Sequence, residues 1–400
     1  MNSSPLRLLV VGGGWAGASL VAALLPYARG QLAITVVDPF LRRPFMPDLV
    51  HALDWPAPRL LASTWSPAPL WHKAGVRWVR DLATALDPVR HRLECATHRP
   101  LEFDLAVLAT GAVADWDGVP GLDGGRLSLT NAPHAALVAD QLPRFTPTGP
   151  LALVVAAPVG KPTSVPPLDL PAISALTLYR AKDPRPRAKR PLLLLTPYAS
   201  LAESLGQTAG QELLNRLKQL GIVVMAGARV ERSEQTAVYL AGQARPLKAA
   251  HLLWLPPLRN RAWLFRSGLC NPEGWVPVNA WQQHVDFPDL YAIGDCAAGR
   301  LKWGSIATAS AATAARHIAH RLKGGTLGSP PQGRPVEWVA PFTSAQGLYA
   351  VGAEGTTLSL AFGRMPLYLA GWQRTWARRR GWIPSLWSGA RGEGLFQGQG

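Results

Sequence analysis

The chain has 400 residues, of which 48% are hydrophobic and 16% charged, and its formal net charge is +16. This length is too great for one compact core, and this composition is too apolar for a disordered protein, so we expect two folded domains and a tail. The positive charge favours anionic surroundings, whether nucleotide phosphates, nucleic acid or anionic lipid, and does not choose among them.

The aromatic, cysteine and apolar content narrows the class of protein further. The 16 tryptophans favour a boundary between apolar and wet surroundings, such as a membrane surface. The cysteines Cys95, Cys270 and Cys296 are too far apart for a C-x-x-C pair or a ligand cluster, so we predict no metal site and no disulfide scaffold. No apolar run reaches the length of about 18 to 20 residues that a transmembrane helix needs.

The first forty residues predict a βαβ unit. Leu6–Val11 is a continuous apolar run, typical of a buried parallel strand, and three glycines follow it directly. The stretch Trp15–Leu25 predicts a helix that ends before Pro26, and Ile34–Val37 predicts the next strand. A signal peptide over Leu6–Leu25 is the weaker alternative, because a signal peptide does not require this glycine spacing.

The glycines form the pattern Gly12-x-Gly14-x-x-Gly17, which in a βαβ unit is the dinucleotide-binding fingerprint. The first glycine allows a tight turn, the second lets a pyrophosphate approach the backbone, and the third lets the helix pack closely on the strand. Asp38 ends the second strand about 20 residues later, where a carboxylate can accept hydrogen bonds from a ribose. We therefore predict a dinucleotide site here.

Two later strands carry further signals. Leu105–Gly111 is an apolar strand that ends in Ala109-Thr110-Gly111, and Leu290–Asp295 is a third strand that ends in Gly294-Asp295. With the fingerprint, these segments resemble the pyridine nucleotide-disulfide oxidoreductase superfamily of flavoproteins, over most of the first 325 residues. Members bind FAD on an N-terminal G-x-G-x-x-G, an A-T-G strand and a late G-D, whose Asp holds the ribityl and phosphate region.

The resemblance implies FAD as the cofactor and a set of residues that contact it. The segment from Lys302 to Ala307 is similar to a lysine-containing loop near the flavin in the sulfide:quinone oxidoreductase branch. No catalytic residue is assigned. The implied FAD-binding residues are Gly12, Gly14, Trp15, Ala16, Gly17, Asp38, Leu82, Ala109, Thr110, Gly111, Gly294, Asp295 and Lys302.

Superfamily members repeat the fingerprint in a second domain, for NAD(P)H, and this chain does not. Leu151–Ala156 predicts a strand, but a proline-rich segment follows it, with prolines at 158, 162, 166, 167 and 171. Proline lacks the backbone N–H that cradles a pyrophosphate, so we expect weak use of NAD(P)H. The domain itself is expected to fold, with strands at Leu192–Leu195 and Gly221–Met225 and a helix at Ala209–Leu220.

Two branches of the superfamily are similar to this chain. The altered second fingerprint looks like the sulfide:quinone oxidoreductase and flavocytochrome c sulfide dehydrogenase branch, although its loop carries Thr163 and Ser164 and no cysteine. Phe45–Leu49 resembles a loop over the flavin in type II NADH dehydrogenases, whose glutamine-bearing motif is replaced by Ile306–Ser310. The electron donor, NAD(P)H or a reduced sulfur compound, and the acceptor, expected to be a membrane quinone, both stay open.

The C-terminal region predicts a helix that lies in a membrane interface. Large apolar residues recur between Met365 and Trp376 at helical spacing, and arginines at 374, 378, 379 and 380 crowd the end. The alternative is a helix packed on the protein's own core. The final stretch 391–400 is glycine-rich and expected to be disordered, and the basic cluster from Arg180 to Arg190 reads as an exposed loop, so we predict no nucleic-acid partner.

The fold class predicted is α/β, with two Rossmann-like domains and a C-terminal amphipathic segment. The expected boundaries are 1–125 and 256–325 for the FAD domain, 126–255 for the interrupting second domain, and 326–400 for the membrane-interface region. The predicted protein is an FAD-dependent oxidoreductase in the cytoplasm, peripheral on the inner face of the cell membrane, and a homodimer is left open. The alternative is a non-catalytic flavin-binding redox sensor or scaffold at the membrane.

Truncation after Phe362 tests the membrane prediction. Each arginine near an anionic surface adds about 1 kcal/mol to the membrane-binding free energy of an interfacial helix, and salt weakens this electrostatic contribution. We expect full-length protein to sediment with anionic vesicles at low salt and the truncated protein to stay in the supernatant with its flavin spectrum intact. Aggregation or flavin loss after truncation would instead indicate a core helix, because removal of such a helix exposes apolar surface.

Overall fold

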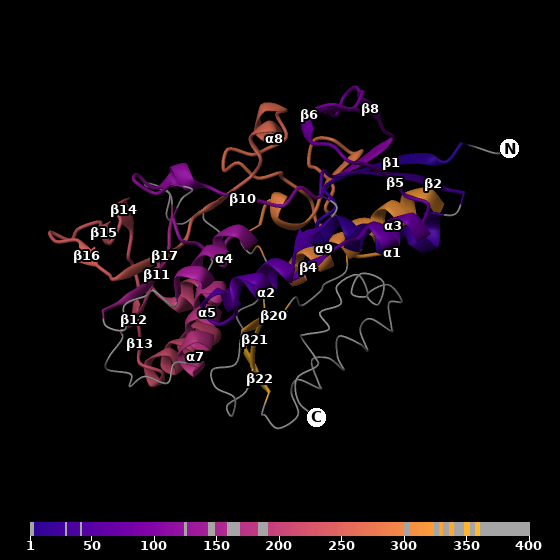
Figure 1. Ribbon diagram of the computed structural model, residues 1–400. Coiled ribbons are helices and arrows are strands. Elements are labelled where there is room, and N and C mark those ends of the chain that lie inside the picture. Colours follow the sequence, from indigo (N-terminus) through magenta and orange to yellow (C-terminus); the bar gives the residue numbers. More distant parts are fainter. Residues whose placement is uncertain are drawn as a thin grey trace.

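The protein is described by a computed structural model in which two parallel sheets dominate (Figure 1). The residues described are 4–360 except for 29, 41, 124–125, 143–148, 158–168, 183–190, 300–301, 303, 324–327, 331–335, 340–347 and 353–356. The predicted helix between Met365 and Trp387 and the tail 391–400 lie outside these residues, as do the proline-rich loop 158–168 and most of the basic cluster Arg180–Arg190. The prediction of an exposed loop is wrong for Arg180, which lies in a helix and is 6% exposed.

The first sheet contains the predicted βαβ unit and has the strand order β19-β9-β1-β2-β5. All of its pairings are parallel. The strand β19 follows the second sheet in the sequence. The first sheet is therefore made from two separate parts of the chain. The strands are β1 (Leu6–Val11), β2 (Leu32–Val37), β5 (Arg77–Val79), β9 (Leu105–Leu108) and β19 (Leu290–Ala292).

Alternating side chains of β1 face two different layers, as the period of a strand requires. Leu8 and Val10 pack against the helices α1 (Trp15–Ala28) and α9 (Gly304–Lys323), which also contact each other. Leu9 and Val11 face the opposite layer, which is made of β6 (Ala83–Asp87), β7 (Arg92–Cys95), β8 (Leu101–Glu102) and α8 (Ala262–Arg266). Helices cover one face of the sheet, and strands with one short helix cover the other.

Several boundaries differ from those predicted, among them the start of β2 at Leu32 and the end of β9 at Leu108. The helix α1 continues through Pro26 to Ala28, because the fixed φ of proline is compatible with a helix and only one N–H bond is lost near the end. The predicted strand Leu290–Asp295 ends at Ala292, and Gly294–Cys296 forms the 3-10 turn η5. Gly294 has φ +67°, a left-handed conformation that ends the strand.

The second sheet has the parallel order β13-β12-β11-β17 and repeats the layered plan. The strand predicted at Leu192–Leu195 is confirmed as β12, and the predicted helix Ala209–Leu220 corresponds to α7 (Gln207–Gln219). The other strands are β11 (Leu151–Val155), β13 (Ile222–Met225) and β17 (His251–Leu255). The helical layer adds α4 (Ala132–Gln141), α5 (Asp169–Lys182) and α6 (Leu201–Leu205), and the opposite layer is β14 (Val230–Ser233), β15 (Ala237–Leu240) and β16 (Leu247–Lys248).

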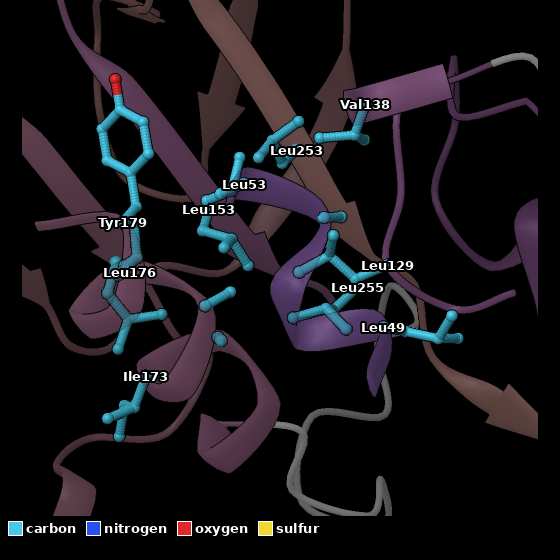
Figure 2. Close-up of a cluster of buried hydrophobic side chains, with 14 of the residues drawn as sticks. Leu49, Leu53, Leu129, Val138, Leu153, Ile173, Leu176, Tyr179, Leu253 and Leu255 are labelled. Carbon is cyan, nitrogen blue, oxygen red and sulfur yellow. The ribbon is translucent and has the colours of Figure 1, made fainter. Parts of the chain in front are cut away.

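A segment from the first part of the chain completes the core of the second sheet. The turn η1 (Met46–Leu53) and the helix α2 (Ala57–Ala62) pack against α4, and η1 also packs against α5. Figure 2 shows Leu49 and Leu53 of η1 in one cluster with Leu153 of β11 and with Leu253 and Leu255 of β17. The first part of the chain therefore contributes side chains to the core of the second sheet. The boundaries at 125, 255 and 325 stay predictions.

Short elements complete the described chain: β3 (Arg43–Pro44), β4 (Thr64–Trp65), α3 (Ala68–Lys73), β10 (Val113–Ala114), η2 (Trp116–Gly118), β18 (Leu258–Arg259), β20 (Val336–Val339), β21 (Leu348–Gly352) and β22 (Thr357–Leu360). Within the described residues, none of the helices has both the length and the apolar character needed to cross a membrane. The predicted α/β class with two Rossmann-like sheets is confirmed.

Candidate functional site

The glycine loop between β1 and α1 is shaped by two contacts that exclude side chains. A Cβ on Gly12, which has φ +105°, would lie 2.3 Å from the carbonyl oxygen of Ala109. A Cβ on Gly17 would lie 2.0 Å from the carbonyl oxygen of Gly12. Both distances are far below a van der Waals contact, so only glycine fits. The start of α1 thereby lies against the ends of β1 and β9, as the fingerprint predicts.

Gly14 differs from its neighbours because the space beside it is open. The nearest heavy atom to a Cβ built there is Nη1 of Arg43, 3.9 Å away. The first N–H groups of a helix have no partner within the helix, and α1 begins one residue later, at Trp15. An open space lined by such donors fits the pyrophosphate of a dinucleotide.

Asp38 braces the glycine loop from the end of β2. Its side chain is 1% exposed, and its Oδ2 accepts the backbone N–H of Gly13 at 2.5 Å. Its Oδ1 accepts the N–H of Phe40 at 2.8 Å, and the guanidinium of Arg43 also contacts the carboxylate. Asp38 thus lies beside the loop, at the place where the fingerprint needs a ribose acceptor, but it already has protein donors on both oxygens.

The A-T-G segment lies directly beneath this loop. The N–H of Ala109 donates to the carbonyl of Val11 at 2.8 Å, which aligns the end of β9 with the end of β1. The carbonyl of Thr110 accepts a hydrogen bond from Nε of Arg261 at 3.4 Å. Gly111 has φ +66°, and no atom lies within 4 Å of a Cβ built on it. The chain therefore turns away from the strand into open space.

The late G-D segment joins the same edge of the sheet. A Cβ on Gly294 would lie 2.9 Å from the Cβ of Ala16, and the N–H of Gly294 donates to Oγ of Ser310 at 3.0 Å. Burial raises the pKa of the Asp295 carboxyl, and the ammonium of Lys302 partly opposes this shift. Three segments distant in sequence thus converge at the carboxyl ends of β1, β9 and β19.

Lys302 is a partly buried cation with an unusual pKa. Its Nζ donates to the carbonyl of Ala297 at 2.6 Å and lies 3.9 Å from the centre of the Trp275 ring. Burial lowers the pKa of the Lys302 ammonium to about 8, although Asp295 acts in the opposite direction. The segment after it was predicted as a loop, but the structure begins α9 at Gly304.

The other predicted residues lie around this edge. Trp15 opens α1 and donates from Nε1 to Oγ1 of Thr308 at 2.8 Å. Leu82 follows β5, two strands away from β1, and its side chain is 51% exposed. The assignment of these residues to FAD stays a prediction, because geometry alone does not identify the ligand.

Three residues at the site were not predicted. Trp71 is 1% exposed, and its ring lies 2.2 Å from the position of a Cβ on Gly13, so residue 13 must also be glycine. The triple glycine was the available signal for that contact. Arg43 and Arg261 are partly buried beside the loop, and nothing in the spacing of the sequence indicates them. Burial, with a contribution from the charge of Arg261, lowers the pKa of Arg43 to about 10.

Comparison with known proteins agrees with this geometry. Residues 189–315 match the family model described as pyridine nucleotide-disulphide oxidoreductase. The mitochondrial sulfide:quinone oxidoreductase of Mus musculus is 23% identical over 306 residues, which cover 72% of this chain and 65% of that protein, slightly under two thirds of its length.

Solved structures give the same fold. The sulfide:quinone oxidoreductase of Aquifex aeolicus superposes with a TM-score of 0.80 at 19% identity, over 95% of this chain and 92% of the other. NDH2 of Plasmodium falciparum, solved with NADH, superposes with a TM-score of 0.67 at 12% identity, over 93% and 94%.

The layered sheets and the glycine loop at their edge define a dinucleotide-binding oxidoreductase fold. The predicted resemblance to the pyridine nucleotide-disulphide oxidoreductase superfamily is confirmed by the match of residues 189–315 to its family model. The prediction of FAD as the cofactor is confirmed at this level, because this superfamily and the relatives above are FAD-binding flavoproteins.

Two glycine substitutions separate binding from folding. Gly14→Leu should fill the open space and abolish FAD binding, while the unfolding free energy of the flavin-free protein changes by less than about 1 kcal/mol. Gly17→Ala should cost more than about 2 kcal/mol, because its Cβ would collide with backbone. Both variants are checked by their flavin content, from absorbance, and by the unfolding free energy of the flavin-free protein. Normal flavin content in Gly14→Leu would contradict the placement of the pyrophosphate.

Lys302 predicts a pH dependence of stability. Its pKa in the folded protein, about 8, is below the value of 10.5 for an unperturbed lysine, so burial of the ammonium costs free energy below pH 8. This cost disappears as the pH rises from about 8 towards 10.5. Lys302→Met should therefore stabilise the flavin-free protein by about 1 to 2 kcal/mol at pH 7 and by much less at pH 10, after allowance for partial exposure.

The matched control is Lys248→Met, at an exposed lysine on β16. Thermal unfolding midpoints of wild type and both variants across this pH range give the measurement. Equal destabilisation by Lys302→Met at every pH would show that its hydrogen bond and ring contact outweigh the burial of charge.

Proposed function

We propose that the protein is an FAD-dependent oxidoreductase that passes two electrons from a soluble reductant, NAD(P)H or a reduced sulfur compound, to a membrane quinone. The observation that supports it most directly is the glycine loop, where Gly12 and Gly17 admit no side chain and the space at Gly14 is open. Bound FAD supplies reversible acceptance of an electron pair. The chain's own residues bind it, orient it and set its surroundings.

Each part of the site has a role in this proposal. The N-terminal N–H groups of α1 bind the pyrophosphate at Gly14. Asp38 faces the ribose, through acceptor capacity beyond that used by Gly13 and Phe40. Asp295 lies at the ribityl region, and Lys302 beside it supplies the opposing positive charge, in agreement with the mutual effects on their pKa values.

The sequence of the second unit supports weak NAD(P)H binding. Its first strand, β11, ends at Val155. In the sequence after it, prolines at 158, 162, 166 and 167 replace the repeated glycines of a phosphate-binding loop, and proline has no backbone N–H to offer a pyrophosphate.

The cysteines do not favour the thiol chemistry of sulfide oxidation. Burial raises the pKa of the Cys95 and Cys270 thiols to about 11 and also raises that of Cys296, which is 0% exposed. A thiol must ionise to act as a sulfur nucleophile, so these three groups are poor nucleophiles at neutral pH. A reduced sulfur donor would have to react at the flavin directly.

The acceptor and the location belong to the same proposal. Similarity to a sulfide:quinone oxidoreductase and to NDH2 supports a quinone acceptor. The predicted peripheral association with the inner face of the cell membrane, in the cytoplasm, would bring the flavin to that quinone. A homodimer is compatible with it. The expected weak binding of NAD(P)H and the poor nucleophilicity of the three cysteines also support the alternative of a flavin-binding redox sensor or scaffold.

Anaerobic mixing with NADH, NADPH and sulfide in turn tests the proposal. Flavin absorbance near 450 nm should bleach with one reductant and recover when a soluble quinone is added. We expect a Michaelis constant for NADH well above the low-micromolar range, because the proline-rich loop has Gly160 but not the repeated glycines of a fingerprint. Bleaching by none of the three would support the sensor, and a low-micromolar constant for NADH would contradict the interpretation of the second unit.

A further inference from the structure

Two arginines from different parts of the chain reach the glycine loop. Arg43 lies on the short strand β3, and its Nη2 contacts the carboxylate of Asp38. Its other terminal nitrogen, Nη1, lies 3.9 Å from the position of a Cβ on Gly14. The buried Nε of Arg43 has no hydrogen-bond partner among the residues that the structure describes. Asp38 therefore holds one side of the guanidinium and leaves the other side toward the open space at Gly14.

Arg261 lies at the A-T-G side of the site. It is the residue that precedes α8, and its Nε donates to the carbonyl of Thr110, in the A-T-G segment. Among the residues that the structure describes, no carboxylate lies within 4.0 Å of the Arg261 guanidinium. Its neighbour Arg259 has two such partners, Asp115 and Asp117. The charge of Arg261 is thus not balanced by an ion pair.

The two arginines border the same glycine loop, because Arg43 lies beside Gly14, and the Cα of Thr110, whose carbonyl Arg261 binds, is 3.1 Å from the position of a Cβ on Gly12. Burial lowers the pKa of both, and the charge of Arg261 lowers that of Arg43 further. Two partly buried cations with a single carboxylate leave an excess of one positive charge. Like charges held in a partly dry site destabilise the folded protein unless an anion joins them.

We propose that Arg43 and Arg261 form a two-arginine clamp for the pyrophosphate of FAD, an inference that rests on the proposed flavoprotein function. A pyrophosphate diester carries two negative charges, so with Asp38 it would bring the site from an excess of one positive charge to an excess of one negative charge. The N-terminus of α1 supplies the remaining positive potential. A guanidinium presents two parallel N–H donors, a geometry that matches phosphate oxygens.

The clamp makes a prediction that a structural role would not make. Arg261→Gln removes one of two repelling charges, so the flavin-free variant should unfold at the same or a higher temperature than wild type. The same change should weaken FAD binding. If Arg261 served only to hold α8 to Thr110, its loss would lower the unfolding temperature and leave the affinity of the folded protein unchanged.

Titration of flavin-free protein with FAD and with riboflavin gives the test. Loss of one charge-assisted contact should weaken FAD binding about 10- to 100-fold for Arg261→Gln and for Arg43→Gln. Riboflavin has no phosphate, so its affinity should change less than about twofold. Added salt should weaken FAD binding to wild type more than to either variant, because salt screens charge pairs.

Arg42→Gln and Arg259→Gln are the matched controls. Both residues neighbour the clamp in sequence, and both are exposed. They should keep wild-type affinity for FAD and wild-type salt dependence. Because Arg43→Gln leaves the Asp38 carboxylate without its cation, Arg43→Lys is also measured. Lysine keeps the positive charge but lacks the two parallel N–H donors of a guanidinium, so this variant should lose an intermediate amount of FAD affinity.

The clamp is overturned if Arg261→Gln binds FAD as the controls do, or if FAD and riboflavin lose affinity equally. Failure of the proposed function has a different signature. Protein that binds FAD normally but is not reduced by NADH, NADPH or sulfide would contradict electron transfer, while the binding titrations still decide the clamp. Wild-type protein that takes up no FAD would overturn both.

Discussion

The site depends on one backbone contact, the approach of α1 to the ends of β1 and β9. The carbonyl of Gly12 occupies the position of a side chain at residue 17, and the carbonyl of Ala109 occupies that of a side chain at residue 12. A β-carbon at either glycine would push the helix away and turn its N-terminus from the edge of the sheet. The open space at Gly14 and the support from Asp38 both follow from this contact. The geometry of the site therefore requires that residues 12 and 17 have no Cβ.

The sequence predicted well those features that local patterns determine. Apolar runs and a glycine turn specify the first βαβ unit, because strand, turn and helix depend on neighbours along the chain. The partners of Leu49 and Leu53 could not be predicted, since apolar residues in η1 do not indicate which of two cores they join. The positions of Arg43 and Arg261 at the site were not predicted, for a similar reason. Their side chains meet the loop only through tertiary structure, and neither stands at a position that the fingerprint defines.

The second unit shows that a Rossmann-like fold does not require its usual ligand. Its sheet, helices and outer strands repeat the plan of the first unit, and Leu151–Val155 is a fully buried strand. Apolar side chains on both faces of the sheet stabilise it whether or not a glycine turn follows. The segment 156–168 can therefore diverge without loss of the fold. The packing of η1 and α2 on this unit adds a reason to retain it, because its removal would expose Leu49, Leu53 and Leu60.

Three segments of the site, at 12–17, 109–111 and 294–295, are brought together by the first sheet, whose last strand β19 is made late in the sequence. A ligand that contacts all three binds the folded sheet and not the unfolded chain, so its binding free energy adds to the stability of the fold. At a ligand concentration of 100 times the dissociation constant this addition is about 2.7 kcal/mol. The two guanidiniums, which share the single carboxylate of Asp38, would act in the opposite direction in the empty protein. Their repulsion makes the flavin-free state less stable, and the same charges strengthen binding of the anionic cofactor, so a stability cost in one state becomes an affinity gain in the other.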